Sequence, residues 1–305
     1  MSVGTVVGVD IGGTNIRIGA SEDGIELTHF LRTSSKEVLT GRESLNNLTA
    51  LLTEYIRTEL DGTIPSAICL GLPATIDKAR NMVIQAPNIK GFDGIPLREL
   101  LTAELGTTVF IEKDVNLLYC HDRNILHLDR EGIHVGIYIG TGIGNAIFIN
   151  GQPLTGKDGA AGELGHIPFV KNGKKCGCGN IGCSECYAAG KYLAELVETR
   201  FSGEFVGDLF IRYADSPELR EFVTDVARVI AAEINILNPE TVVLGGGVLN
   251  MKGFPTDRML AEVKQFSRKP YPADSLAVYL SSDDVANGVK GAVAYALERL
   301  TGQVM

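Results

Sequence analysis

The stretch "TVVGVDIGGTNIRIGA" (residues 5–20) decides the fold, because it places a turn rich in glycine and threonine between two apolar strands. The same pattern returns in "HVGIYIGTGIGNAIFING" (residues 134–151), and another apolar strand ends in glycines in "TVVLGGGV" (residues 241–248). Repetition of one strand–turn–strand unit indicates a duplicated architecture. The sequence therefore predicts an α/β protein with two related lobes and a cleft between them.

The segments around these turns alternate between helix and strand. Apolar residues recur at helical spacing in residues 42–60, and a proline at a plausible first helical position opens residues 96–105. The apolar runs at residues 66–74 and 107–112 are typical of buried strands. Helix and strand thus alternate, as in an α/β lobe.

The chain shows no low-complexity linker between its halves, so the lobes are divided by the repeated pattern alone. A final helix at about 287–301 is expected to fold back on the first lobe. We expect a smaller N-terminal lobe of residues 1–115 plus about 288–305, and a larger C-terminal lobe of residues 116–287.

The composition is that of a globular protein with an acidic surface. The 305 residues are 45% hydrophobic and 21% charged, with a formal net charge of −9. Such a surface repels phosphate backbones and anionic lipids, so neither nucleic acid nor a membrane is expected as a partner. The first ten residues lack the basic region of a signal peptide, and residues 133–156 carry too many polar groups and glycines for a bilayer. A cytoplasmic location is expected.

The glycine turns have the chemistry of phosphate-binding loops. Glycine lets backbone amides approach an anion, threonine adds a hydroxyl donor, and an aspartate suits hydrated Mg²⁺. A single turn of this kind is more often a plain β-hairpin, but three of them favour a nucleoside triphosphate. The turns fit neither a Walker loop nor a dinucleotide fold. The candidate residues for ATP and Mg²⁺ are Asp10, Gly12, Gly13, Thr14, Thr141, Gly142, Gly245, Gly246 and Gly247.

Four cysteines gather in "KKCGCGNIGCSECY" (residues 174–187), within a glycine-rich loop. In a reducing compartment such clusters bind metal more often than they form disulfides, and thiolates suit zinc. A redox centre and a nucleic-acid-binding zinc module are the competing interpretations. By spacing alone, Cys186 could complete a four-cysteine site with Cys176, Cys178 and Cys183.

Asp114 lies at the end of an apolar strand in "IEKDVN" (residues 111–116). Phosphoryl transfer needs a base for the attacking hydroxyl, and a carboxylate where the lobes meet could supply it. The alternative is that Asp114 only caps the helix that follows.

Four motifs in this order resemble the ROK family of bacterial repressors, open reading frames and sugar kinases. They are "DIGGTN" (10–15), "GTGIG" (140–144), "GELGH" (162–166) and "CGCGNIGCSE" (176–185). The resemblance covers residues 5–291. It implies an actin-like (ribonuclease H-like) two-lobed ATPase fold that closes over ATP, Mg²⁺ and a hexose, and members of the family are often homodimers.

The resemblance also implies roles for particular residues. Asp114 matches the catalytic base that deprotonates the 6-hydroxyl of the sugar. The implied sugar ligands are Gly71, Asn88, Lys113, Asp114, Glu163, His166 and Glu185. The implied structural zinc site, in the loop 166–186, consists of His166, Cys176, Cys178 and Cys183, which leaves Cys186 outside it.

Two positions depart from the common family pattern. Lys113 stands where most members have an asparagine that binds a ring hydroxyl, and Ala74 stands where many have glycine. A basic residue before the catalytic aspartate resembles the allose-kinase branch, which implies phosphorylation of D-allose to D-allose 6-phosphate. Glucose, mannose, fructose and N-acetylmannosamine are the alternative substrates, and Lys113 could instead be a surface lysine that points away from the site.

Two other functions compete with a sugar kinase. A repressor of this family needs a DNA-binding segment before the first phosphate motif, and nine residues precede Asp10. A sugar-sensing protein without catalysis is the second alternative, because Lys113 replaces the usual asparagine.

Overall fold

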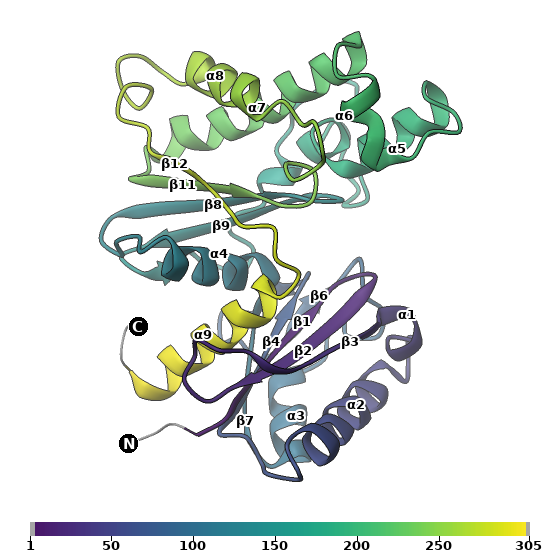
Figure 1. Cartoon of the computed structure of the whole chain (residues 1–305), viewed down its shortest axis with the longest axis vertical. Helices are drawn as coiled ribbons and strands as arrows, with labels where there is room; N and C mark the ends of the chain where they lie inside the picture. Colours follow the sequence, from purple (N-terminus) through teal and green to yellow (C-terminus); the bar gives the residue numbers. More distant parts are fainter. Residues whose placement is uncertain (1–3, 303–305) are drawn as a thin grey trace. The chain divides into compact units, whose positions relative to one another are not determined.

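The computed structural model describes residues 4–302. These form two compact units, which Figure 1 shows with the sequence coloured from purple to yellow. Unit 1 contains the described residues up to Asp129, the segment Thr155–Ala161 and the described residues from Asp284 onward. Unit 2 contains Arg130–Leu154 and Gly162–Asp283.

Unit 1 is built on a five-stranded sheet with the strand order β3-β2-β1-β4-β7. β1, β2 and β3 are antiparallel, whereas β4 and β7 are parallel to β1. The strands are β1 (Val6–Ile11), β2 (Asn15–Ser21), β3 (Thr28–Ser34), β4 (Ala67–Leu72) and β7 (Thr108–Lys113), with a separate pair β5 (Thr75–Ile76) and β6 (Val83–Gln85). The helices are α1 (Ser35–Val38), α2 (Ser44–Glu59), α3 (Leu97–Leu105), α4 (Asp114–Ile125) and α9 (Asn287–Thr301).

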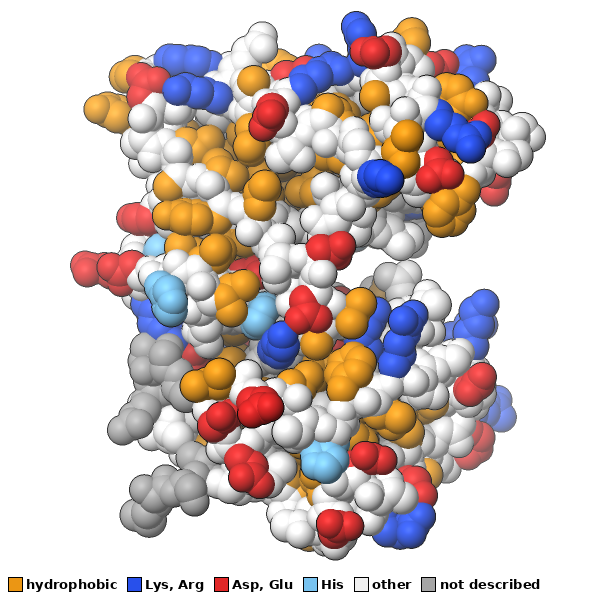
Figure 2. Space-filling view, viewed as in Figure 1, with side chains coloured by type: hydrophobic (Ala, Val, Ile, Leu, Met, Phe, Trp, Pro, Cys, Tyr) orange, Lys and Arg blue, Asp and Glu red, His pale blue; other side chains and the backbone are white. Residues whose placement is uncertain are grey.

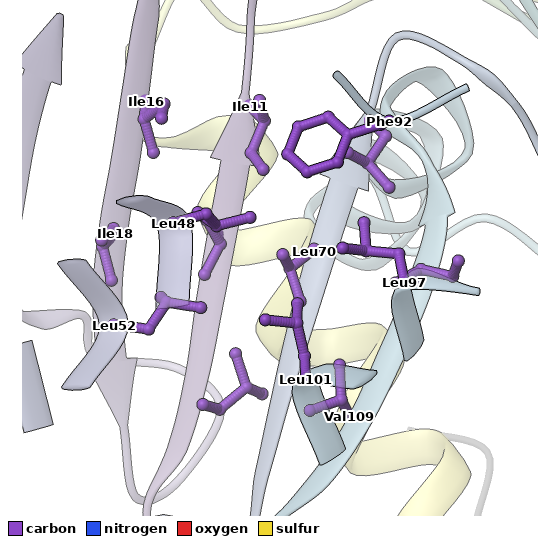
Figure 3. Close-up of a cluster of buried hydrophobic side chains, with 14 of the residues drawn as sticks. Ile11, Ile16, Ile18, Leu48, Leu52, Leu70, Phe92, Leu97, Leu101 and Val109 are labelled. Carbon is purple, nitrogen blue, oxygen red and sulfur yellow. The ribbon is translucent and has the colours of Figure 1, made fainter. Parts of the chain in front are cut away.

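Alternation along the central strands gives the sheet of unit 1 two different faces. Val7, Val9 and Ile11 of β1 belong to a core that α2 and α3 cover, which Figure 3 shows with Leu48, Leu52, Leu97 and Leu101. The alternate residues Gly8 and Asp10 lie against α9 on the other face. A Cβ atom added at Gly8 would lie 2.3 Å from the carbonyl oxygen of Val289, so glycine is needed there for α9 to approach.

Unit 2 repeats the same sheet, in the strand order β10-β9-β8-β11-β12. Three antiparallel strands are again followed by two parallel ones. The strands are β8 (Ile133–Ile139), β9 (Ile143–Ile149), β10 (Gln152–Pro153), β11 (Thr241–Gly245) and β12 (Val278–Leu280). The helices are η1 (Leu164–His166), η2 (Ser184–Cys186), α5 (Gly190–Thr199), η3 (Val206–Asp208), α6 (Leu209–Arg212), α7 (Pro217–Leu237) and α8 (Thr256–Phe266). The shared topology confirms the predicted pair of related α/β lobes.

The units divide at different residues from those expected. α4 stays with unit 1 because it packs closely on α9 and β4: a Cβ atom added at Gly291 would lie 1.9 Å from the carbonyl oxygen of Leu117. The first boundary therefore falls after Asp129 rather than at residue 115, and unit 1 is not the smaller one. Unit 1 also gains Thr155–Ala161, where a Cβ atom at Gly159 would lie 1.8 Å from the carbonyl oxygen of Ile76.

The surface of both units carries charges of both signs. Figure 2 shows acidic and basic side chains interspersed on the visible face rather than gathered by sign. Among the helices of residues 4–302, none is both long and apolar enough to cross a bilayer.

Candidate functional site

The first phosphate-type turn joins β1 to β2 and is held from within its own unit. The amide of Gly12 donates to the carbonyl of Asn15 at 2.9 Å, and the hydroxyl of Ser35 donates to the carbonyl of Gly12 at 2.6 Å. The amide of Ser35 donates to the carbonyl of Thr14 at 3.0 Å. Gly13 and Thr14 at the tip are exposed. The turn therefore presents backbone amides and a hydroxyl to solvent on a fixed base.

Asp10 precedes this turn and lies at the start of α9. A Cβ atom added at Gly288 would come within 2.7 to 3.0 Å of the carboxyl group of Asp10. Arg17, its partner across the hairpin, donates from Nη1 to Oδ2 of Asp10 at 2.8 Å. Burial raises the pKa of Asp10, and the Arg17 guanidinium opposes that increase. A cation near Asp10 would therefore meet a carboxylate that already has one charged partner.

Asp114 is the first residue of α4, directly after β7. Its Oδ1 accepts a hydrogen bond from the amide of the next residue, Val115, at 2.8 Å. The N-cap position of α4 is Lys113, and the helix has no side-chain cap bond, so the alternative that Asp114 only caps the helix is not borne out. Burial, and then the charge of Asp10, raise the pKa of Asp114 to about 6, against the opposing effects of the Val115 amide and of Lys113. The carboxylate therefore combines a hydrogen bond to the first turn of α4 with an increased affinity for a proton.

Gly71, on β4 between β1 and β7, provides the space that Asp114 occupies. A Cβ atom added at Gly71 would lie 2.9 Å from Cδ1 of Leu117 and 3.5 Å from Cα of Asp114. Asn88 is exposed beside the phosphate turn, where a Cβ atom added at Gly13 would lie 3.6 Å from its carbonyl oxygen. Asp10, Gly71, Asn88 and Asp114 thus belong to one unit.

Lys113 is 9% exposed, and its Nζ donates to the carbonyl of Ala161 at 3.1 Å. The side chain is therefore buried beside Asp114 rather than spread over the surface, which removes the alternative of a plain surface lysine.

In unit 2 the other glycine turns lie at one edge of the sheet. The turn at Gly140–Gly142 joins β8 to β9, and residues 245–247 follow the parallel neighbour β11. A Cβ atom added at Gly246 would lie 2.5 Å from the carbonyl oxygen of Ile139, so these glycines pack against the end of β8. The first amides of α5, those of Gly190 and Lys191, donate to the carbonyls of Gly140 and Thr141 at 2.8 and 3.1 Å.

His166, Cys176, Cys178 and Cys183 come together in unit 2. One donor atom from each lies within 4.8 Å of all the others. Cys178 Sγ is 3.6 Å from Cys183 Sγ, and Cys176 Sγ is 3.6 Å from His166 Nδ1. Zinc at ~2.3 Å from each sulfur holds sulfur atoms about 3.7 Å apart in a tetrahedron, so the donor set fits this ion. Cys186 is buried nearby but lies outside the four-residue group.

Two candidate sugar ligands lie directly beside this cysteine–histidine group. Glu163 Oε2 is 3.9 Å from Nε2 of His166, on the side of the ring opposite the cysteines. Oε1 of Glu185 lies 3.7 Å from Nδ1 of His166 and accepts from Cys176 Sγ at 3.2 Å. Nζ of Lys191 donates to the same Oε1 atom. Within unit 2, a metal at the cysteines and a ligand at the carboxylates would therefore share His166.

Sequence reasoning missed three residues that contact or lie behind the candidate site residues: Arg17, Lys191 and Glu112. The Asp10–Arg17 contact could have been found from the hairpin, because the two residues are directly opposite each other on β1 and β2. The Lys191–Glu185 ion pair carries no local signal, because its residues are six positions apart and belong to two different helices, η2 and α5. Glu112, whose side chain is completely buried behind Asp114, gave no signal either.

The chain is similar to several known sugar kinases. The chain is 32% identical over 266 residues to a glucokinase of Thermotoga maritima, covering 80% of this chain and 82% of that protein. It is 26% identical to an N-acetyl-D-glucosamine kinase of Escherichia coli, covering 82% and 86% respectively. A crystal structure of a ROK hexokinase from Thermus thermophilus superposes with a TM-score of 0.75 at 28% identity, covering 97% of this chain and 99% of that one.

These similarities extend over both units and establish the actin-like two-lobed α/β fold. The ROK family model matches residues 6–299, and the chain therefore belongs to the ROK family.

Proposed function

We propose that the protein is an ATP-dependent sugar kinase that transfers the γ-phosphoryl group of ATP to the 6-hydroxyl of a hexose. The similar proteins named above are a glucokinase, an N-acetyl-D-glucosamine kinase and a hexokinase. The observation that carries the proposal is Asp114, a largely buried carboxylate at the end of β7 with its pKa raised to about 6. General-base catalysis is most effective when the pKa of the base lies near the working pH.

Asp114 is the proposed base. At neutral pH it is ionised, and its poor solvation makes it a stronger proton acceptor than an exposed aspartate. The hydrogen bond from Val115 fixes one carboxylate oxygen and leaves the other to receive the proton of the attacking hydroxyl. Transfer is then a matter of holding that hydroxyl and the phosphate in line.

The triphosphate and its metal are assigned to the glycine turns. The exposed tip at Gly13 and Thr14 and the turn containing Thr141 and Gly142 offer backbone amides to phosphate oxygens. Asp10, which already accepts from Arg17, suits an outer-sphere contact to the hydrated Mg²⁺ that accompanies ATP. The proposed role of residues 245–247 is contact with the nucleoside.

Glu163, His166, Glu185 and Asn88 are the proposed sugar ligands. Carboxylates paired with an imidazole and an amide are suited to vicinal hydroxyls, which both donate and accept. Zinc, if bound by His166 and the three cysteines, would supply structural cross-linking of the loop rather than catalysis. That cross-link would hold Nε2 of His166 toward Glu163 and keep Glu185 in place.

D-allose is the proposed substrate, because Lys113 stands where most members of the family have asparagine. A buried ammonium beside Asp114 offers donors only, whereas asparagine also offers an acceptor. Glucose, mannose, fructose, N-acetylmannosamine and N-acetylglucosamine are the competing substrates.

A coupled assay for ADP release, run with Mg·ATP and each of these sugars, tests the activity and identifies the preferred substrate. We expect turnover with at least one hexose, and Asp114→Asn should reduce kcat by at least about a thousandfold while sugar binding by calorimetry is retained. Undiminished turnover in the variant would disprove the base assignment. Measurable sugar binding without ADP release by the wild type would instead support a noncatalytic sugar-sensing protein.

A further inference from the structure

Glu112 has no exposed side-chain surface, yet it is surrounded by donors. β1, β4 and β7 are parallel, and their register places Asp10, Gly71 and Glu112 side by side. The side chain of Glu112 therefore points to the face of the sheet that α4 and α9 cover, immediately behind the start of α4. A carboxylate can be buried at this depth only when all its lone pairs are satisfied.

The two oxygens of Glu112 have different partners. Oε1 accepts from the amide of Lys113 at 2.8 Å and from Nδ2 of Asn116 at 2.9 Å. Oε2 accepts from Nε of Arg80 at 2.8 Å and from the hydroxyl of Tyr295 at 3.2 Å. One oxygen is thus bonded to the residues on both sides of Asp114, and the other to a loop and to α9.

We propose that Glu112 and Asn116 are positioning residues for Asp114: they clamp the junction between β7 and α4 on both sides of the catalytic carboxylate. The inference rests on the proposed function. Arg80 and Tyr295 hold the other oxygen of Glu112 and so anchor the clamp to the rest of unit 1. Asn116 is 4% exposed and touches the clamp through a single side-chain bond.

The physical reason for such a clamp is the environment of Asp114. Asp114 faces the carboxylate of Asp10 from β1 and the ammonium of Lys113 from β7, and it is largely buried. Repulsion from Asp10 and the cost of desolvation both favour movement of Asp114 toward water. Small displacements of a reacting group reduce turnover steeply. Movement of the junction between β7 and α4 would therefore lower kcat without changing how substrates bind.

Asn116→Ala and Tyr295→Phe form a matched pair that tests the clamp. Each removes one hydrogen bond to the same buried carboxylate, but only Asn116→Ala removes a bond to Oε1, and with it the tie between Glu112 and the start of α4. We expect kcat of Asn116→Ala to fall about 10- to 100-fold with KM for sugar and ATP within about twofold of the wild type. Tyr295→Phe should stay within about twofold in every constant. Asn116→Ser, whose hydroxyl is too short to reach Glu112, should reproduce the result if the alanine variant folds poorly.

A measurement independent of activity accompanies these kinetics. ¹³C NMR titration of the Asp114 carboxyl carbon, assigned with Asp114→Asn, should give a lower pKa in Asn116→Ala than in the wild type, because the loosened turn admits water. Tyr295→Phe should leave that pKa in place. Equal effects of the two variants on kcat and on the Asp114 pKa, or an increase in KM alone for Asn116→Ala, would overturn the proposal. An inactive wild type would disprove the proposed function, while the titration would still decide whether Asn116 holds Asp114.

Discussion

Replacing Asp114 with asparagine should make the folded protein more stable at neutral pH even as it removes the proposed base. Burial and the nearby Asp10 carboxylate raise the pKa of Asp114 from 3.8 to about 6. A raised carboxyl pKa means that the folded state tolerates the ionised form less well than the unfolded state does. Asparagine carries no charge, and its amide oxygen can still accept from Val115.

The size of the effect follows from the shift in pKa. About two units at 1.36 kcal/mol each give roughly 3 kcal/mol. Above pH 6, where Asp114 is ionised in both states, the folded wild type is destabilised by this full amount. As the pH falls through 6, the folded state takes up the proton first and the cost shrinks, and below 3.8 both states are protonated and the cost disappears. The variant should therefore be about 3 kcal/mol more stable at pH 8 and about equal to the wild type near pH 3.5.

Urea unfolding of both proteins, followed by circular dichroism from pH 8 to pH 3.5, measures this difference, because titrating groups that do not interact with Asp114 contribute equally to both proteins. Asp61→Asn, at an exposed position of the same unit, is the control and should change the free energy of unfolding by less than about 0.5 kcal/mol. The reasoning is refuted if Asp114→Asn gives no gain at pH 8, or if the gain is the same at both ends of the pH range.

Three other predictions concern the same residues and the metal. Because Asp114 must be ionised to accept a proton, kcat/KM should fall about tenfold for each pH unit below 6, and a flat profile between pH 4.5 and 6.5 would contradict this. Gly288→Ala would place Cβ 2.7 Å from the carboxyl carbon of Asp10, so KM for Mg·ATP should rise at least several-fold while KM for sugar stays constant in steady-state assays. Elemental analysis should find about one zinc ion per chain in the wild type and in Cys186→Ser but little in Cys178→Ser; the reverse pattern for the two variants would show that Cys186 is a ligand.

The parts of the fold that depend on short-range pattern could be predicted. The hairpins around both glycine turns combine alternating apolar residues with turn residues, all within fewer than twenty positions. The last helix was expected at about 287–301 and is found at Asn287–Thr301, because its apolar periodicity and the glycine after it are local signals. The cluster of His166 with three cysteines was suggested by family resemblance, not by spacing, which left Cys186 open.

The missing parts depend on packing between distant segments. The sequence pattern placed the first boundary at residue 115, whereas the unit extends to Asp129. The difference follows from the contact of α4 with Gly291, which lies far along the chain and leaves no local signal. The buried Arg80–Glu112 pair likewise joins a loop to a strand that is not its sequence neighbour. An isolated glutamate in "IEKDVN" reads as an exposed charge, because buried carboxylates are rare unless paired and the partner is invisible locally.

The close contact of α9 with β1 has a consequence for biosynthesis. β1 is among the first segments to leave the ribosome, yet the helix that covers Gly8 and Asp10 is made some 280 residues later. The strands and helices of unit 2 are all complete by Asp283, before α9 is translated. The two faces of β1 are therefore covered at different times: α2 and α3 can cover one face early, but the face that carries Gly8 and Asp10 stays without α9 until the end of synthesis. A nascent chain stalled before residue 287 exposes that part of the sheet to chaperones or to aggregation.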